Sequence, residues 1–338
     1  MNDMVVVGEH MGQPVVLPQT IPNATINTCT ILNETIRTHA GLMQWSTCII
    51  CGNGIYELEN KVMKKSHYGP VCRGWILRRL EDGSLERTTD DYQIVVKKYC
   101  CRKVRENSCP DDAMQEFAAL EFIGEHPNVC GFIGCFTDGH HYYSIMPFYN
   151  GNELIALVMD NRTLEEAACK ELFLQLLNGL EYLQSRGIFH RDLSLENIVC
   201  TEDNRIVIID YGMVLCIPQN INTGGAHLIP SPVPRGKKNY MAPEVLAYNE
   251  PYDGFRSDIW SVGIILFVML TKKFPLTKAS PLCKFYRHIR DGRLARMCQH
   301  WNMGLSADAE DLLCRLLSAD PSRRPTIAEI RAHPWLAG

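Results

Sequence analysis

The sequence lacks several features that would assign a chain to common functional classes. Its 34 lysines and arginines do not outnumber its 38 acidic residues, and the formal net charge is −4, which argues against a protein that binds nucleic acid through bulk electrostatics. The apolar run Val262 to Leu270 is too short to cross a bilayer and indicates a buried core helix. The first residues lack the basic segment and apolar core of a secretory signal. We therefore expect a cytoplasmic protein whose partners include neither nucleic acid nor a membrane.

Cysteine is abundant, but its spacing does not indicate a metal site. The chain has 15 cysteines at scattered positions. Cys48 and Cys51 form a single Cys-x-x-Cys pair, and no second pair follows at a fitting distance. Because a structural zinc ion needs four ligands, we interpret these two as ordinary cysteines near a domain edge. Most of the others are expected to be reduced, buried side chains.

The residue pattern changes twice along the chain and predicts three parts. Residues 1–55 are rich in Thr, Asn, Pro and Val without a helical period, so we expect an extended or partly disordered leader. Residues 56–149 have the pattern of strands with one helix, and residues 150–338 are mainly helical. The predicted fold class is α+β, with a small β-rich lobe, a large α-helical lobe and a ligand-binding cleft at their junction.

Two segments carry helix start signals. Ser108-x-x-Asp111 resembles a capping box before an apolar stripe that includes Met114 and Phe117. Thr163-x-x-Glu166 stands in the same way before a long leucine-rich segment. We therefore predict one helix inside the β-rich part and a long helix at the start of the helical part.

Three polar side chains lie on neighbouring loops of the helical part. Asp192 and Asn197 share the loop that follows the long helix, and Asp210 follows the next short strand. An Asn and an Asp are hard oxygen ligands suited to Mg²⁺, which keeps some waters and is completed by phosphate oxygens. With Asn197 and Asp210 as metal ligands, Asp192 remains to accept a proton from an attacking hydroxyl or to orient it.

A lysine in an apolar strand supplies the cation that this chemistry needs. Lys97 follows Ile94, Val95 and Val96, and a buried ammonium requires an anionic partner. Glu116, on the inward side of the predicted helix, can provide it, and the ammonium can then hold a phosphate. A metal, a cationic clamp and a positioned nucleophile are the parts that phosphoryl transfer uses.

The motifs together resemble the eukaryotic protein kinase family, over about residues 56–337. The matching segments are the loop His190 to Asn197, Asp210-Tyr211-Gly212, Ala242-Pro243-Glu244, Ile94 to Lys97, Asp258 to Gly263, and Asp320 to Pro325. The order and separations of these segments are those of the family. The segment His333 to Leu336 weakly resembles calcium/calmodulin-type kinases.

The resemblance implies a bilobal kinase fold and assigns roles to individual residues. ATP and Mg²⁺, or Mn²⁺, are the implied cofactors, and the implied structural ion pair joins Glu244 to Arg324. His190 is expected to pack in the core rather than to act as an acid or base. The residues expected to contact the nucleotide are Gly69, Val71, Val95, Lys97, Met146, Phe148, Tyr149, Glu153 and Val199. The catalytic set is Asp192, Lys97, Glu116, Asn197, Asp210 and Lys237.

The chain departs from the family at two places near the phosphates. The glycine-rich loop is reduced to Lys64-Lys65-Ser66-His67-Tyr68-Gly69, in which only the last glycine remains. Either the bulkier side chains obstruct the close approach of backbone N–H groups to phosphate, or the lysines supply charge in their place. Ser194 stands where Ser/Thr kinases have a lysine. We hypothesise that Lys237, where those kinases have threonine, replaces this charge.

Two functional interpretations remain open at this stage. The first is an active protein kinase that transfers the ATP γ-phosphate to Ser or Thr hydroxyls of a protein. Arg191 then pairs with a phosphate placed on Ser231 or Thr223 by an upstream kinase, with Ser231 favoured. The alternative is a pseudokinase that binds nucleotide or scaffolds partners with little phosphotransfer, which the degraded loop and Val95 favour. A small-molecule kinase is disfavoured by the long segment that ends at Glu244.

Overall fold

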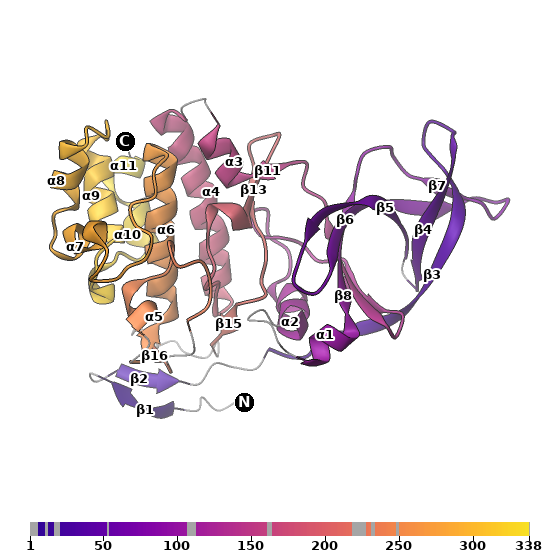
Figure 1. The fold of residues 1–338 in the computed structure, drawn as a ribbon, viewed down its shortest axis with the longest axis horizontal. Coiled ribbons are helices and arrows are strands. Elements are labelled where there is room, and N and C mark those ends of the chain that lie inside the picture. The colour runs from indigo at the N-terminus through magenta and orange to yellow at the C-terminus, as the bar shows by residue number, and fades with distance from the viewer. Residues whose placement is uncertain are drawn as a thin grey trace. The chain divides into compact units, whose positions relative to one another are not determined.

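The computed structural model describes residues 6–10, 13–16, 21–52, 54–106, 113–160, 164–217, 228–230, 234–247 and 250–337. The chain forms two compact units (Figure 1). Ile21–Asn150 make up one, which we call the β unit. Met1–Thr20 and Gly151–Gly338 make up the other, which we call the helical unit.

The β unit is built on an eight-stranded sheet in the order β4-β5-β6-β7-β3-β9-β10-β8. Two helices, α1 (Cys101–Glu106) and α2 (Ala113–Ile123), follow β8. The strands are β3 (Ile26–Arg37), β4 (Met43–Cys51), β5 (Gly54–Lys65), β6 (Pro70–Arg79), β7 (Leu85–Arg87), β8 (Ile94–Cys100), β9 (Gly134–Thr137) and β10 (His141–Pro147).

This sheet closes on itself. β3 pairs with β4, β7 and β9, and β6 pairs with β5, β7 and β8. The pairing of β3 with β9 is parallel and runs from Ile26 opposite Cys135 to Thr28 opposite Thr137. Closure removes the unpaired strand edges that an open sheet would expose.

The structure differs here from the expected leader. Residues 26–51 form β3 and β4 inside the sheet, so the described part of residues 21–55 belongs to the β unit. The sequence signal for a strand is weak here because both faces of β3 are partly exposed, and of its residues only Ile36 is fully buried. The Thr and Ile residues of β3 favour a strand. Gly41, at φ +83°, provides the positive φ that the turn into β4 uses.

A buried ion pair fastens β4 to the rest of the sheet. The guanidinium of Arg87 donates to both carboxylate oxygens of Glu57, at 2.6 and 2.7 Å. Ser46 of β4 donates to the same carboxylate at 2.6 Å, and the Trp75 ring lies 3.5 Å from the Arg87 guanidinium carbon. Glu57 is fully buried, so these partners compensate the cost of removing its charge from water.

The helical unit contains two long helices, α4 (Glu166–Ser185) and α6 (Gly254–Thr271), and several short ones. The short helices are α3 (Leu154–Met159), α5 (Pro243–Ala247), α7 (Lys284–Arg290), α8 (Leu294–His300), α9 (Ala307–Leu316), α10 (Ile327–Arg331) and α11 (Pro334–Ala337), with 3₁₀ turns η1 (Leu195–Asn197) and η2 (Pro321–Arg323). Short strands also lie in this unit: β11 (Gly151–Glu153), β12 (Ile188–Phe189), β13 (Ile198–Thr201), β14 (Ile206–Ile208), β15 (Leu215–Cys216), β16 (Leu228–Ile229) and β17 (Tyr252–Asp253).

α6 is the central helix of this unit. The carboxylate of Asp253 accepts from the N–H groups of Phe255 and Arg256 and caps its first turn. The helix is long and apolar enough to cross a membrane, but 78% of it is buried inside the protein. The predicted buried core helix over Val262 to Leu270 is therefore confirmed.

The β unit contains two helices, α1 and α2, where the sequence predicted one. Both helix start signals include residues outside the described part of the chain. Ser108, Asp111 and Thr163 lie outside the described residues. α4 begins at Glu166, and Glu165 at its N-cap makes no side-chain capping bond. In α2 the inward side carries Glu116 and Phe117 as expected, whereas Met114 is exposed.

The first strands of the chain pair within the helical unit. β1 (Val6–His10) and β2 (Gln13–Val16) form an antiparallel hairpin. This hairpin continues into a four-stranded sheet with the order β1-β2-β16-β17. In Figure 1 the hairpin lies beside β16.

Candidate functional site

The loop between β12 and β13 places Asp192 and Asn197 together. The Asn197 amide nitrogen donates to the Asp192 carbonyl at 2.9 Å and to its carboxylate oxygen Oδ2 at 2.8 Å. Both bonds come from the nitrogen, so the amide oxygen of Asn197 faces away from Asp192. The loop thus presents a carboxylate and a carbonyl-type oxygen in different directions, which suits one proton-accepting group and one cation ligand.

Asp258 of α6 anchors the same loop. The Asp258 carboxylate accepts from the backbone N–H groups of His190 and Arg191, at 2.7 and 3.0 Å. Burial raises the pKa of Asp258 to about 7, and the two N–H donors oppose this by favouring the ionised form. The anchor fixes the backbone immediately before Asp192.

His190 is a buried neutral side chain, as expected. Its Nδ1 accepts from the Asp192 N–H at 3.3 Å and its Nε2 lies 3.3 Å from the carbonyl oxygen of Ile209. These two partners together select the neutral tautomer with the proton on Nε2. Burial lowers the pKa of His190, and its ring packs on Tyr211 at 5.4 Å between centroids. His190 therefore positions the loop and does not carry protons.

Asp210 follows β14 in a backbone conformation rare for residues other than glycine, with φ +69°. Its side chain is exposed, and the next residue, Tyr211, is buried with its hydroxyl donating to the Ile208 carbonyl at 2.7 Å. Tyr211 is thus buried, whereas Asp210 immediately before it is exposed. The charges of Asp192 and Asp210 both oppose the lowering of the His190 pKa that burial causes.

Lys237 contacts the loop as the sequence hypothesis requires. Its ammonium lies 3.1 Å from Asp192 Oδ2 and 3.0 Å from the Ser194 hydroxyl, and its backbone N–H donates to Asp192 Oδ1 at 2.9 Å. Gly236 precedes it at φ +102°, and a Cβ there would lie 2.7 Å from the Arg191 carbonyl oxygen. The close approach therefore needs glycine at position 236.

Two further contacts hold the segment after Lys237. The Tyr240 hydroxyl donates to Glu196 at 2.8 Å and accepts from the Leu195 N–H at 3.3 Å. The expected pair between Glu244 and Arg324 is confirmed, with nitrogen–oxygen distances of 2.6 and 2.7 Å. The segment is thus tied to η1 on one side and to η2 on the other.

In the β unit, the ion pair predicted between Lys97 and Glu116 is present. The Lys97 ammonium lies 2.7 and 2.9 Å from the two Glu116 carboxylate oxygens. The Tyr99 hydroxyl donates to the same carboxylate at 2.8 Å. Both side chains of the pair are largely buried, and the third donor fixes the orientation of the carboxylate.

The turn between β5 and β6 replaces the glycine-rich loop and is tight. The Ser66 N–H donates to the Gly69 carbonyl at 2.8 Å, and the Gly69 N–H donates to the Ser66 hydroxyl at 3.2 Å. Tyr68 is buried against Tyr99 at 5.6 Å between ring centroids. Two amides of the turn are thus used within it, and Tyr68 fastens its tip to β8.

The other residues expected at the nucleotide lie on paired strands or directly after β10. In the β unit, Val71 is opposite Lys97 and Val95 is opposite Met146. Phe148 donates its N–H to the Gln93 carbonyl at 2.8 Å, and the Tyr149 hydroxyl accepts from the Gly131 N–H at 2.9 Å. In the helical unit, Glu153 is opposite Val199.

A resident metal ion is not indicated in the described part of the chain, where no group of three or more His, Cys, Asp or Glu could hold one. Asn197 and Asp210 are the residues that would hold an ion arriving with a phosphate ligand, because Mg²⁺ commonly uses one or two protein oxygens plus substrate phosphates and water. Thr223 and Ser231 lie outside the described residues.

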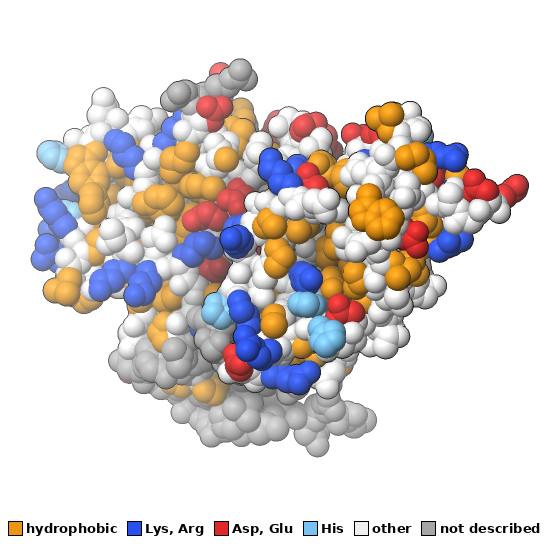
Figure 2. Space-filling view, turned by 45° about the vertical axis from the view of Figure 1, so that its right-hand side comes forward, with side chains coloured by type: hydrophobic (Ala, Val, Ile, Leu, Met, Phe, Trp, Pro, Cys, Tyr) orange, Lys and Arg blue, Asp and Glu red, His pale blue; other side chains and the backbone are white. Residues whose placement is uncertain are grey.

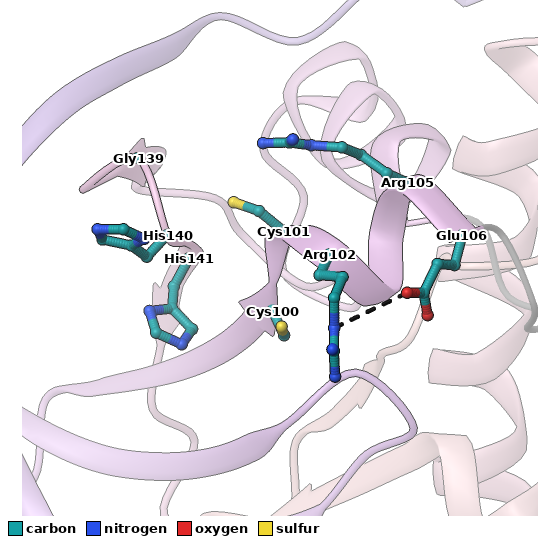
Figure 3. Close-up of a pocket in the computed structure, with 8 residues that line it drawn as sticks. All are labelled: Cys100, Cys101, Arg102, Arg105, Glu106, Gly139, His140 and His141. Atoms are coloured by element: carbon teal, nitrogen blue, oxygen red, sulfur yellow. Dashed lines mark ion pairs between the residues drawn. The ribbon is translucent and has the colours of Figure 1, made fainter.

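A cavity of about 490 Å³ lies elsewhere in the β unit, beside α1 and the turn between β9 and β10. Arg102 and Arg105 point to opposite sides of α1, and Arg102 pairs with Glu106 at 3.8 Å (Figure 3). His140 and His141 come from the turn. Figure 2 shows basic side chains and histidines gathered on the face it presents. None of the residues expected at the nucleotide lines this cavity.

A family model for the protein kinase domain matches residues 84–336. The chain belongs to the protein kinase family. The structure accordingly has the protein kinase fold, with a β-sheet region followed by a helical C-terminal region. The match begins at residue 84, later than residue 56, where the resemblance was expected to start.

Individual relatives are distant. CBL-interacting protein kinase 31 of Oryza sativa subsp. japonica is 29% identical over 250 residues, which cover 74% of this chain and 53% of the relative. CBL-interacting protein kinase 17 of the same organism is 35% identical, with coverages of 67% and 47%. Sperm motility kinase 2B of Mus musculus is 31% identical, with coverages of 70% and 46%. The chain spans about half the length of these relatives.

Two residues of the site were missed by sequence reasoning. Tyr99 lies two positions after Lys97, so the alternation of a strand places both side chains on one face, and this signal was available. Tyr240 connects η1 to the segment before Glu244, and its sequence position alone did not reveal the Glu196 contact.

Proposed function

We propose that the chain is an ATP-dependent protein kinase that phosphorylates Ser or Thr hydroxyls of protein substrates. The observation that carries this proposal is the contact of Lys237 with Asp192 and Ser194. A pseudokinase has no need of a lysine that stands in for the missing catalytic-loop lysine. Its presence beside the candidate base favours retained phosphotransfer.

The chain's own groups have distinct tasks in this reaction. Asp192 Oδ1 and Oδ2 are oriented by Lys237 and Asn197, and Asp192 aligns the acceptor hydroxyl and takes its proton as the oxygen attacks the γ-phosphorus and the bond to the leaving ADP breaks. Lys237 offers positive charge to the phosphoryl oxygens during transfer. Lys97, held by Glu116, binds the nucleotide phosphates. Asn197 and Asp210 would hold Mg²⁺, which neutralises phosphate charge.

The proposal is tested by phosphate transfer to a generic protein substrate, with Asp192→Asn as the matched control. Asparagine keeps the shape of the side chain but cannot accept the proton. We expect Mg²⁺·ATP to raise the melting temperature of both proteins by mass action, and transfer to be lost in the variant. Equal transfer by both proteins would refute the assignment of Asp192.

A second candidate is a pseudokinase that binds nucleotide or scaffolds partners. The tight turn from Ser66 to Gly69 favours it, because two amides that could face phosphate are used inside the turn. Nucleotide-dependent stabilisation without transfer by the wild-type chain would support this candidate over the first.

Control by an upstream kinase is part of the proposal. Arg191 has a left-handed backbone at φ +66°, and its guanidinium donates to the Met213 carbonyl at 3.3 Å. A phosphate on Ser231 or Thr223 would offer this guanidinium a stronger, charge-assisted partner. Phosphatase treatment should then lower the transfer rate, and an unchanged rate would contradict this control. A cytoplasmic location remains a prediction from the sequence.

A further inference from the structure

The segment between Asp210 and Glu244 contains a strand that is paired on both sides. β16 consists of Leu228 and Ile229, which are both buried. On one side it pairs antiparallel with β17, with Leu228 opposite Asp253 and Ile229 opposite Tyr252. On the other side it pairs in parallel with β2, with Leu228 opposite Val15 (Figure 1).

The partner on the second side comes from the far end of the chain. β2 belongs to the hairpin of residues 6–16, which precedes the whole β unit in sequence. A two-stranded ribbon is at best marginally stable, whereas three or more strands sustain one another. Without the hairpin, β16 and β17 form such a ribbon, and the edge of β16 is left unpaired. The addition of an extended strand to an open edge is a common mode of peptide recognition.

β16 is connected to the catalytic loop through a short series of contacts. β17 ends at Asp253, whose carboxylate caps α6. One turn further along α6, Asp258 accepts from the backbone of His190 and Arg191, next to Asp192. The strand that the hairpin pairs with is thus linked by continuous backbone and hydrogen bonds to the candidate base.

We propose that β16 is a strand-docking site and that its ligand is the chain's own hairpin of residues 6–16. Docking of β2 fixes β16, and a fixed β16 favours the contact of Lys237 with Asp192. Release of the hairpin weakens this contact and lowers phosphotransfer. The docking itself does not depend on catalysis, and its effect on phosphotransfer rests on the proposed function.

The docking is tested with Val15→Pro, with Val15→Ala as its matched control. Val15 pairs with β1 on one side and with β16 on the other. The backbone N–H of Val15 therefore donates to either β1 or β16. Proline has no N–H, so the substitution removes that hydrogen bond whichever strand accepts it. Alanine shortens the side chain and keeps the N–H. A difference between the two variants therefore reports the loss of backbone pairing and not the loss of the valine side chain.

The readout is hydrogen exchange at the amides of Leu228 and Ile229 in the full chain. A parallel pairing centred on Leu228 and Val15 uses one of these two amides. We expect that amide to exchange at least about tenfold faster in Val15→Pro than in Val15→Ala. An excess of a synthetic peptide of residues 1–20 should restore the slow exchange in Val15→Pro, and a scrambled peptide should not. Equal exchange in the two variants would overturn the proposal.

The same samples separate the remaining outcomes. If the slow exchange of this amide in the wild-type protein is lost on dilution, the strand that pairs with β16 comes from a second copy of the chain. The assignment of the chain's own hairpin as the ligand would then be wrong. In phosphotransfer, Val15→Pro should be about three- to tenfold slower than Val15→Ala. Faster exchange with an unchanged rate would overturn the regulatory role. If no variant and no wild-type sample transfers phosphate, the proposed function fails, while the exchange result still decides the docking.

Discussion

Replacing Lys237 with alanine should reduce the turnover number without unfolding the protein. The Lys237 ammonium lies 3.1 Å from Asp192 Oδ2 and 3.0 Å from the Ser194 hydroxyl. Its side chain is 34% exposed, so removal leaves no large cavity, and the melting temperature should stay close to that of the wild type. The loss is expected in the chemical step, where charge develops on the transferred phosphoryl group.

The expected size follows from the geometry. Removal of one preorganised donor from a water-excluded site costs about 100- to 1,000-fold in kcat. Because water reaches part of Lys237, we expect the lower end, a loss of about 100-fold, which is about 2.7 kcal/mol of transition-state stabilisation. The KM for ATP should change much less, since Lys97 and Glu116 are untouched.

The assay is steady-state transfer of phosphate from ATP to a generic protein substrate. Lys238→Ala is the matched control, because Lys238 is the exposed neighbour of Lys237 and should be neutral. Ser194→Lys placed in the Lys237→Ala background should recover much of the rate, since a lysine at 194 can reach the position that Lys237 vacates. A kcat of Lys237→Ala within about threefold of wild type would refute the reasoning.

Three further predictions concern groups that position the site or hold the sheet. Tyr99→Phe removes one donor from the buried Glu116 carboxylate and should cost about 1–3 kcal/mol of stability, with a rise in the KM for ATP measured by kinetics. His190 stays neutral in the folded protein, so below about pH 6.5 only the unfolded chain gains its proton; the free energy of unfolding should therefore fall as pH drops below that value. Glu57→Gln leaves the buried Arg87 without its counter-charge and should cost about 3–5 kcal/mol in chemical denaturation.

Each of these changes has a control in the chain. Tyr143→Phe removes a hydroxyl that donates to Asp138, so it should leave the KM for ATP unchanged; an equal effect from both tyrosines would contradict the positioning role. His190→Phe should flatten the fall in stability below pH 6.5, and an unaltered pH profile would exclude His190 as its source. Glu86→Gln breaks an exposed pair with Arg78 and should cost less than about 1 kcal/mol. An equal loss of stability in Glu86→Gln and Glu57→Gln would mean that burial of the ion pair does not determine its contribution to stability.

The contacts within the candidate site were predictable because they depend on residue type and short spacing. Asp192 and Asn197 share one loop, and the Lys97–Glu116 pair follows from a lysine in an apolar strand and a glutamate on the inward side of a helix. The contact of Lys237 with Asp192 and Ser194 was predictable because Ser194 lacks the charge that the resemblance leads one to expect. In all these cases the information lies in a few neighbouring positions.

The closure of the sheet was not predictable from local pattern. Strand β3 is partly exposed on both faces, so its residues show no clear alternation. Its position is decided by partners far away in sequence, such as Cys135 opposite Ile26, and by the charge pair of Glu57 and Arg87, separated by 30 residues. Long-range pairing of this kind leaves little trace in a window of ten residues.

The serine at position 194 and the lysine at position 237 have a joint consequence. A lysine at position 194 would sit on the loop that Asp258 anchors to α6, so its charge would be held rigidly whatever the neighbouring segment does. In this chain the charge sits on Lys237 instead, in the segment to which β16 belongs. The position of β16 depends on two strand pairings, one of them with β2. If the proposed function is correct, relocation of the lysine makes catalysis conditional on the order of that segment. A chain with Ser194→Lys and Lys237→Thr should then lose its sensitivity to Val15→Pro while keeping phosphotransfer.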